Sequence, residues 1–450
     1  MFGTALEKSL RQHLLILEPQ RPNRNISAIE TWEHAHAFSQ KIIRPLDDTA
    51  YQKDAFPHEL WAEAGAAGIK GVIIPEEYGG SGLGNLELCL TVMETARASG
   101  ALTVSLVCDQ ALASRQIATF GNQEQKQKYL PGLASGHDVG ALAMSEPNAG
   151  SDVMSMTTRA RKIDGGFVVN GSKYWITNGA RFDPVAGKNT TADTLVLYAK
   201  TDDSEKLTAF IIDGVTEGFE AGGIIKKATT KGSDTAELVF NDCFVPDENV
   251  LGEVGKGATV LMPGLNVERL VFAANTIGVA QAAYEEVQEY LVQREQFGRS
   301  IAFNQSVALG LGNMFSKIDM AQKYITSTAL QSDLDPNAFA RNNDVAASVF
   351  LQAGVIAQEV TDTCQQLYGG VGHTVDFRID RQRGIAALLL VGAGSKQMRE
   401  TIIARAVVPG YAHHVEQVSG LMAQHRAAAE ERANLPTTPQ HSFELPATPK

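Results

Sequence analysis

Two short stretches carry groups that could bind a flat, polar ligand. Residues 145–152 read Ser-Glu-Pro-Asn-Ala-Gly-Ser-Asp, and the hydroxyls and unhindered N–H groups of such a loop suit an anionic or carbonyl-rich ligand. Trp175 and Thr177 follow in a stretch with strand periodicity, so their side chains are expected on one face. An indole beside a hydroxyl can lie along a heteroaromatic ring and hydrogen-bond its edge. An ordinary surface hairpin with a core tryptophan is the alternative interpretation, and the pattern alone does not separate the two.

A glutamate in an apolar helical stretch is the candidate for acid–base chemistry. Within residues 265–274 only Glu268 and Arg269 are charged, and the positions three and four residues after the glutamate are Val271 and Phe272. The carboxylate is therefore expected beside an apolar helix face. Burial raises the pKa of a lone carboxyl, which suits a base that removes a carbon-bound proton near neutral pH. An exposed glutamate near a helix start is the alternative, and the local pattern by itself favours that alternative.

The hydrophobic periodicity changes twice along the chain and predicts three folded segments. Spacings of three and four residues indicate helices in the first and last segments, while a period of two indicates short strands of a β-barrel or sandwich between them. The expected divisions are an N-terminal extension at 1–26, a helical domain at 27–140, a β-domain at 141–255, a helical bundle at 256–410 and a tail at 411–450.

Local signals refine this division. Four leucines at helical spacing in the extension predict a short helix closed by prolines. Asp164-Gly165-Gly166 and Asn170-Gly171 indicate turns of a β-hairpin. Residues 181–191 are expected to form a surface loop, with an active-site mouth or a subunit contact as alternatives, and the Pro- and Thr-rich residues 435–450 are expected to be disordered. Strands are predicted at 194–199, 207–212 and 236–240, and helices at 265–295, 305–332, 345–367 and 397–407.

The bulk composition narrows the class of protein. The 450 residues are 44% hydrophobic and carry a formal charge of −12, which argues against a nucleic-acid-binding protein. The four cysteines show no metal-ligand or disulfide-framework spacing, so buried thiols in a reducing compartment are expected and no metal is predicted. Because no apolar run is long enough to span a membrane and no targeting segment is evident, no membrane association is expected, and a cytoplasmic location is predicted.

Two motifs carry a resemblance to a known family. SEPNAGSDV at 145–153 and KYWITNG at 173–179 resemble the signature of the acyl-CoA dehydrogenase family, and the similarity runs from about residue 54 to about residue 405. Within the family the chain is most similar to the isovaleryl-CoA dehydrogenase branch, on the segments PEEYGGSGLG, RASGA, QKYLPGLASG and VLMPGLNVERLV. The resemblance implies an α+β, mainly α fold, with an N-terminal helical domain, a middle β-barrel and a C-terminal four-helix bundle. It also implies an FAD cofactor and an acyl-CoA substrate.

The resemblance changes the interpretation of Glu268. Most family members carry the catalytic glutamate in a C-terminal segment similar to YEGTS, but here that segment is Gly-Ala-Gly-Ser-Lys at 392–396, with Ala393 in the glutamate's place. A minority branch carries the base on the earlier helix in a motif similar to LERLV, which residues 267–271 match. The common position lacks a carboxylate and the alternative position has one, so Glu268 is predicted to be the base.

The chemistry implied is α,β-dehydrogenation of a short acyl-CoA whose acyl group is straight or branched. The base removes the proton next to the thioester carbonyl, and a hydride leaves the next carbon for the flavin. Negative charge on the carbonyl oxygen needs hydrogen-bond donors, and in the family one donor is the backbone N–H of the residue that corresponds to Ala393. Gly392, which has no Cβ, would leave room for a branched acyl group, although Gly392 and Gly394 could equally be turn glycines.

The same resemblance implies further contacts and partners. The residues expected to contact FAD are Ser145, Gly150, Ser151, Trp175, Thr177, Arg294, Gln296, Phe297, Gln305, Gln366, Gly369, Gly370, Ser395 and Gln397. The residues expected to contact the substrate are Ser151, Asn266, Arg269 and Gly392. Arg294, Gln296 and Phe297 resemble a motif that reaches the FAD of a neighbouring subunit, so a homotetramer or homodimer is expected. An electron-transfer flavoprotein is the expected acceptor, in fatty acid or branched-chain amino acid catabolism.

Some segments depart from the family pattern. Gly-Ile-Ala-Ala at 384–387 replaces an RDAK-like segment, Thr-Thr-Lys at 229–231 lies where a GMR-like segment is expected, and Asn266 replaces an aspartate. These departures suggest a diverged paralogue and leave the acyl chain preference open. A flavin oxidase or monooxygenase of the same fold, or a non-catalytic paralogue, are the alternative functions. Retention of Glu268 argues against the first, and the intact loop and Trp175–Thr177 motifs argue against the second.

Overall fold

The computed structural model describes residues 4–21, 26–183, 188–201, 206–411, 413, 414 and 417. Residues 1–400 form one compact unit, and residues 401–450 form a second. The second unit contains the last residues of helix α14, which spans Lys396–Val407. The tail segment 435–450, for which disorder is expected, lies outside the described residues.

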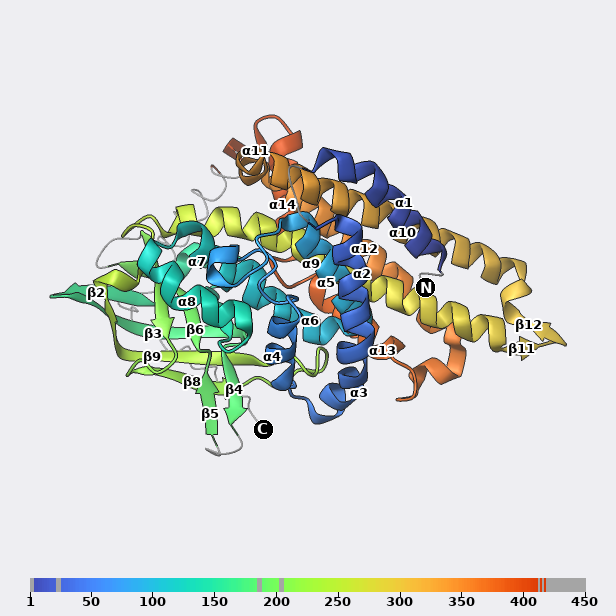
Figure 1. Ribbon diagram of the computed structural model, residues 1–450, viewed down its shortest axis with the longest axis horizontal. Coiled ribbons are helices and arrows are strands. Elements are labelled where there is room, and N and C mark those ends of the chain that lie inside the picture. Colours follow the sequence, from blue (N-terminus) through green and yellow to red (C-terminus); the bar gives the residue numbers. More distant parts are fainter. Residues whose placement is uncertain are drawn as a thin grey trace, which may run out of the picture. The chain divides into compact units, whose positions relative to one another are not determined.

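The first part of the compact unit is helical, as predicted. Its helices are α1 (Ala5–Leu17), α2 (Ala28–Phe38), α3 (Arg44–Lys53), α4 (Glu59–Ala66), α5 (Asn85–Ala98), α6 (Gly100–Val107), α7 (Arg115–Phe120) and α8 (Gln123–Ser135). A π-helical stretch, Cys108–Ser114, joins α6 to α7. The helix predicted in the N-terminal extension is confirmed as α1. Its four periodic leucines, Leu6, Leu10, Leu14 and Leu17, are buried in the main hydrophobic core, and Figure 1 shows α1 beside α10.

The middle part is a β-domain, also as predicted. Its strands are β1 (Gly140–Ala143), β2 (Arg159–Ile163), β3 (Gly166–Thr177), β4 (Ala180–Asp183), β5 (Lys188–Thr191), β6 (Thr194–Thr201), β7 (Leu207–Asp213), β8 (Phe219–Ile224), β9 (Thr235–Pro246) and β10 (Val250–Leu251). An eight-stranded sheet runs in the order β10-β7-β6-β2-β3-β9-β8, with β1 paired to β6. The hairpin at Asp164-Gly165-Gly166 is confirmed, because β2 and β3 pair directly across it.

Two local predictions in the β-domain are wrong. Asn170-Gly171 is not a turn, because β3 continues through it with a shift of register against β9, which marks a bulge. Gly171 is required there for close packing, since a Cβ would lie 2.6 Å from the Thr158 hydroxyl. The insertion expected as a loop instead contains the paired strands β4 and β5. Residues 184–187, between these strands, lie outside the described residues.

The last part of the compact unit is built around one long helix. α9 (Gly257–Gln293) packs against α5 and α12 and extends in Figure 1 from the side of the sheet to the small hairpin of β11 (Glu295–Gln296) and β12 (Arg299–Ser300). The remaining helices are α10 (Gln305–Leu334), α11 (Pro336–Arg341), α12 (Asn343–Tyr368) and α13 (Ile379–Leu389). The predicted long helices are confirmed, although α9 begins eight residues before the expected Leu265, and α11 and α13 are additional.

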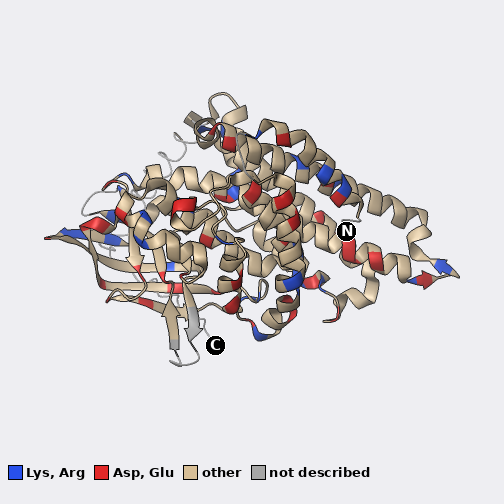
Figure 2. Ribbon diagram, in the orientation of Figure 1, with Lys and Arg blue, Asp and Glu red and all other residues tan. Residues whose placement is uncertain are grey.

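Charged residues are spread over the molecule, and the cysteines are in its interior. Figure 2 shows acidic and basic residues interspersed along the helices and the sheet. All four cysteines are free and buried, as expected. Within the described part of the chain, no helix is long and apolar enough to cross a membrane.

Candidate active site

Helix α9 carries Glu268 into the interior of the protein. The glutamate is only 8% exposed, and its neighbours along the helix are almost all buried. Burial raises the pKa of the Glu268 carboxyl to about 7, against the opposing effect of the nearby Arg269 and Arg399. A carboxyl with such a pKa is ionised in part at neutral pH and can accept a proton from carbon. The exposed-glutamate alternative is therefore wrong.

The end of strand β3 approaches Glu268 through a cysteine. Cys108, the first residue of the π-helical stretch, lies beside the side chain of Thr177. Burial, together with the charge of the nearby Glu268, raises the pKa of the Cys108 thiol to about 12. The thiol therefore stays protonated at neutral pH, and it lies near both the end of the strand and the carboxylate. This arrangement brings Thr177 and Glu268, which are distant in sequence, to one region.

Trp175 lies on an irregular part of the same strand. The register of β3 against β9 shifts between Lys173 and Ile176, and Trp175 has a φ of 67°. A non-glycine residue in this region is strained and is often found at functional sites. The bulge leaves the indole 59% exposed, although its neighbour Ile176 is buried. An exposed indole is available to a flat ligand, and the core-tryptophan alternative is wrong.

A buried ion pair anchors the loop at 145–152 to β3. Glu146 accepts hydrogen bonds from the backbone N–H groups of Thr157 at 2.6 Å and Thr158 at 3.0 Å. Lys173 donates to Glu146 at 2.9 Å and to the Met144 carbonyl at 3.0 Å. Burial alone would raise the pKa of Glu146, but the threonine hydrogen bonds and Lys173 outweigh it and hold the pKa at about 2. The Glu146–Lys173 pair thus ties the loop at 145–152 both to β3, which carries Lys173, and to residues 157 and 158 just before β2.

The loop before α14 presents a backbone donor. Ala393 has a φ of 53°, and among the described residues its N–H has no backbone or side-chain acceptor. A Cβ at Gly392 would have one neighbour within 4 Å, the Leu388 carbonyl oxygen at 3.5 Å, so the space beside Gly392 is open. The Ser395 hydroxyl accepts a hydrogen bond from the Met398 N–H at 3.3 Å and caps α14.

Asn266 and Arg269, the expected substrate contacts, are joined to each other. Asn266 is fully buried, and its amide donates to Asn343 at 2.6 Å and to the Ala340 carbonyl at 3.2 Å. Its Oδ1 accepts from Arg269 at 2.9 Å, while the buried Nε of Arg269 has no partner among the described residues. Both polar ends of Asn266 are therefore occupied, and this side chain braces Arg269 and the region of α11. Direct contact with substrate stays a prediction for both residues.

The predicted cofactor residues fall into two separate groups. Arg294 and Gln296 lie at the β11–β12 hairpin, whose tip residue Phe297 is 99% exposed. Gln366 and the glycines after it are near, since Tyr368 contacts Tyr290 with ring centroids 5.0 Å apart. The end of α9 lies 25 residues after Glu268, about 38 Å along the helix. These residues, with Gln305 at the start of α10, therefore lie far from Glu268, toward the other end of α9.

Two departures from the family pattern meet in space. A Cβ at Gly384, in α13, would lie 2.6 Å from Cγ2 of Thr229, so the threonine fills the space that any other residue at 384 would need. On the same side, Lys231 and Arg381 both stack on the ring of Tyr51, at 5.2 and 5.0 Å from its centroid. The two replaced segments, at 229–231 and at 384–387, therefore pack against each other, and the glycine at 384 makes room for the threonine at 229.

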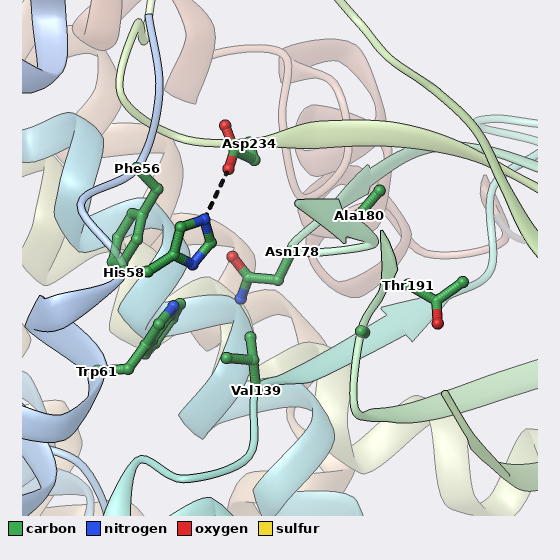
Figure 3. A pocket seen from close by; sticks show the side chains of 9 residues that line it. Phe56, His58, Trp61, Val139, Asn178, Ala180, Thr191 and Asp234 are labelled. Atoms are coloured by element: carbon green, nitrogen blue, oxygen red, sulfur yellow. Dashed lines mark ion pairs between the residues drawn. The ribbon is translucent and has the colours of Figure 1, made fainter. Parts of the chain in front are cut away.

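A small cavity lies apart from these residues. Figure 3 shows it between Phe56, His58 and Trp61 on one side and Asn178 and the β4–β5 hairpin on the other, with a volume of about 20 Å³. His58 and Asp234 lie 3.9 Å apart across it. The volume suffices for about one water molecule, and the lining includes neither Glu268 nor Trp175.

Comparison with known proteins decides the family. Models of the N-terminal, middle and C-terminal domains of acyl-CoA dehydrogenases match residues 28–137, 141–243 and 255–408. The mitochondrial isovaleryl-CoA dehydrogenase of Solanum tuberosum is 42% identical over 378 residues, which cover 83% of this chain and 88% of that protein. The chain belongs to the acyl-CoA dehydrogenase family. Its resemblance to that family is confirmed, and so is the fold class.

Other relatives of this acyl-CoA dehydrogenase differ in substrate. The mitochondrial 2-methylacyl-CoA dehydrogenase of Solanum tuberosum is 42% identical over 381 residues, covering 83% of this chain and 88% of that protein. The structure of butyryl-CoA dehydrogenase from Megasphaera elsdenii has a TM-score of 0.79 at 32% identity and covers 86% of this chain and 100% of that chain. A structure described as the FAD complex of PigA has a TM-score of 0.78 at 26% identity and covers 86% of this chain and 99% of that chain.

Sequence reasoning missed four residues of the site. Lys173 could have been found, because strand alternation through Phe167 and Val169 places it on the buried face, where a cation needs an acidic partner. Glu146, Cys108 and Arg399 carry no such local signal, because their roles depend on contacts between distant segments.

Glu268→Gln should stabilise this acyl-CoA dehydrogenase near pH 8. The pKa is about 7 in the folded protein against an ordinary value of 4.5, so the contribution of Glu268 to stability is present below pH 4.5 and is lost as the pH rises through 7. This difference corresponds to about 3 kcal/mol in the free energy of unfolding. Urea unfolding at about pH 4.5 and about pH 8 should therefore separate mutant from wild type only at the higher pH. Glu63→Gln, an exposed control on α4, should leave the urea midpoint unchanged at both pH values. If Glu268→Gln has the wild-type midpoint at pH 8, the ionised Glu268 carboxylate is not destabilising and the inferred burial of its charge is wrong.

Proposed function

We propose that this chain is an FAD-dependent dehydrogenase that converts a short acyl-CoA, branched as in isovaleryl-CoA, to the 2-enoyl-CoA. The observation that carries the proposal is the buried carboxyl of Glu268, whose pKa of about 7 suits removal of a carbon-bound proton. The relatives that share about 42% identity act, by their names, on isovaleryl-CoA or 2-methylacyl-CoA.

The residues around Glu268 fit a flat cofactor and a thioester. Trp175 offers an exposed ring, Gly150 and Ser151 are exposed in the loop, and the Ala393 N–H has no acceptor within the described part of the chain. FAD, when bound, would supply the acceptor for the hydride that leaves the β-carbon. Glu268 would take the α-proton, and the Ala393 N–H would donate a hydrogen bond to the thioester carbonyl oxygen. The open space beside Gly392 would accept the branch of the acyl chain.

The separation of the two groups of expected cofactor residues supports an oligomer. If Arg294, Gln296 and Phe297 contact FAD, the cofactor belongs to a neighbouring copy of the chain, because they lie about 38 Å along α9 from Glu268. A homodimer or homotetramer is therefore proposed, with an electron-transfer flavoprotein as the acceptor. The cytoplasmic location stays a prediction, since the plant relatives are named as mitochondrial proteins.

The test is anaerobic bleaching of the purified yellow protein by a panel of acyl-CoAs. Isovaleryl-CoA and 2-methylbutyryl-CoA should bleach the flavin fastest, with slower reaction of straight-chain and long-chain thioesters. Rapid recolouring in air with release of hydrogen peroxide would favour an oxidase. Retained FAD without bleaching by any thioester would favour the non-catalytic paralogue and contradict the proposal.

A further inference from the structure

Arg399 is a fully buried arginine whose hydrogen bonds go to the loop beside the candidate site. Its Nη2 donates to the carbonyl oxygens of Leu389 at 2.8 Å, Gly392 at 3.0 Å and Gly394 at 2.8 Å, and its Nε donates to Gly394 at 3.0 Å. One planar guanidinium thus holds three carbonyls that surround Ala393. Burial of a charged group costs several kcal/mol unless its hydrogen bonds compensate, so this position is a demanding one for an arginine.

The guanidinium is fixed from the other side by an aromatic column. Arg399 stacks on Phe350 of α12, with its central carbon 3.7 Å from the ring centroid. Phe350 in turn stacks on Phe272 of α9, with centroids 6.2 Å apart and an angle of 21°. Phe272 lies four residues after Glu268, on the same face of the helix. The column therefore connects the loop at 392–394 to the part of α9 that carries the candidate base.

The bond from Arg399 to Gly392 has a direct effect on Ala393. The carbonyl of Gly392 and the N–H of Ala393 belong to one peptide group, which is planar and trans, so the two point in opposite directions. Holding the carbonyl toward Arg399 aims the N–H away from the guanidinium. A charged donor on the carbonyl also polarises the peptide group and strengthens its N–H as a donor. The strained φ of 53° at Ala393 needs such external support.

We propose that Arg399 is a positioning residue that aims and polarises the Ala393 N–H for the carbonyl oxygen of a bound thioester. The proposal rests on the proposed function, because it assigns the oxyanion donor of that reaction. A lysine could not replace it fully, since an ammonium keeps the charge but lacks the planar group that stacks on Phe350 and the Nε donor that bonds Gly394. A merely structural arginine would affect all ligands alike, whereas a positioning residue affects only ligands with a carbonyl oxygen.

The test compares two CoA ligands that differ only in that oxygen. Binding of a thioester and of the matching thioether, which has no carbonyl, is measured by calorimetry for the FAD-loaded wild type, Arg399→Gln and Arg399→Lys. Arg97→Lys serves as the matched control, a buried arginine paired with Glu7, Glu94 and Glu285 and separate from the residues of the candidate site.

The preference of wild type for the thioester should fall about 10-fold in Arg399→Gln, with thioether affinity nearly unchanged. Bleaching at saturating thioester should slow about 10- to 100-fold, with partial recovery in Arg399→Lys and none of these effects in Arg97→Lys. Equal weakening of both ligands, or an unchanged preference, would overturn the proposal. If Arg399→Gln does not fold, Arg399→Ala with added guanidinium replaces it, and failure of guanidinium to restore the preference overturns the proposal. If no thioester bleaches the wild-type flavin, the proposed function is contradicted. The comparison of thioester and thioether binding would still test the role of Arg399.

Discussion

Glu268→Gln should slow bleaching of the flavin by isovaleryl-CoA at least about 1,000-fold while the protein keeps its FAD. The amide has the shape of the carboxylate but cannot accept the α-proton at neutral pH. Wild type should also show an acid limb, with the bleaching rate rising through about pH 7, because only the ionised form of Glu268 is a base. Stopped-flow measurement of the visible flavin band under anaerobic conditions gives both results.

The control for this substitution is a second glutamate on the same helix. Glu289 is exposed near the end of α9, some 30 Å along the helix from Glu268. Glu289→Gln should bleach at the wild-type rate. Bleaching of Glu268→Gln at the wild-type rate would remove this residue from the mechanism, and the base would then have to be sought elsewhere.

Lys173→Met should lower the free energy of unfolding by about 3–5 kcal/mol, because it leaves the buried carboxylate of Glu146 without its cation. The same change removes the donor that holds the Met144 carbonyl at 3.0 Å. The loop at 145–152 should then loosen, and FAD should be lost from the protein more readily. Denaturant unfolding and the absorbance of flavin retained after gel filtration measure the two effects.

A double substitution separates the lost charge balance from the lost anchor. Glu146→Gln with Lys173→Met removes both charges and should recover much of the stability, but not the retention of flavin. Lys162→Met is the matched surface control, since Lys162 pairs with Asp247 where both side chains are well exposed, and it should cost less than about 1 kcal/mol. Equal stability of Lys173→Met and wild type would show that Glu146 does not need this partner.

The elements of the fold could be predicted where local periodicity decides. The four leucines of α1 indicate a helix with one buried face, which is a local property. The strands predicted at 194–199 and 207–212 form as β6 and β7, which are buried along almost their whole length on both faces. Asn170-Gly171 gave the wrong prediction because its glycine serves a bulge, where Thr158, just before β2, leaves no room for a Cβ. The sequence around Gly171 gives no sign that Thr158 packs against it.

The candidate site was predicted less completely, for a similar reason. The apolar face beside Glu268 suggests burial, and burial is confirmed, but the pattern itself could not exclude a solvent-exposed helix start. Trp175 and Thr177 were placed near each other by strand alternation. The link from that strand to the base runs through Cys108, which comes from a π-helical stretch that no periodicity signals. Arg399 could not be assigned at all, because its partners are backbone carbonyls.

Helix α1 sets a practical limit on how the protein can be shortened. The family model for the N-terminal domain begins at residue 28, so a truncation there would remove α1 completely. The surface of the bundle that the four leucines cover would be exposed to water. The free energy of unfolding would fall by roughly 6–12 kcal/mol, an upper estimate from the lost apolar burial. Arg97 would also lose Glu7, one of its three acidic partners. Affinity tags and fusion partners therefore have to join ahead of Thr4, which caps this helix, and not at the family boundary.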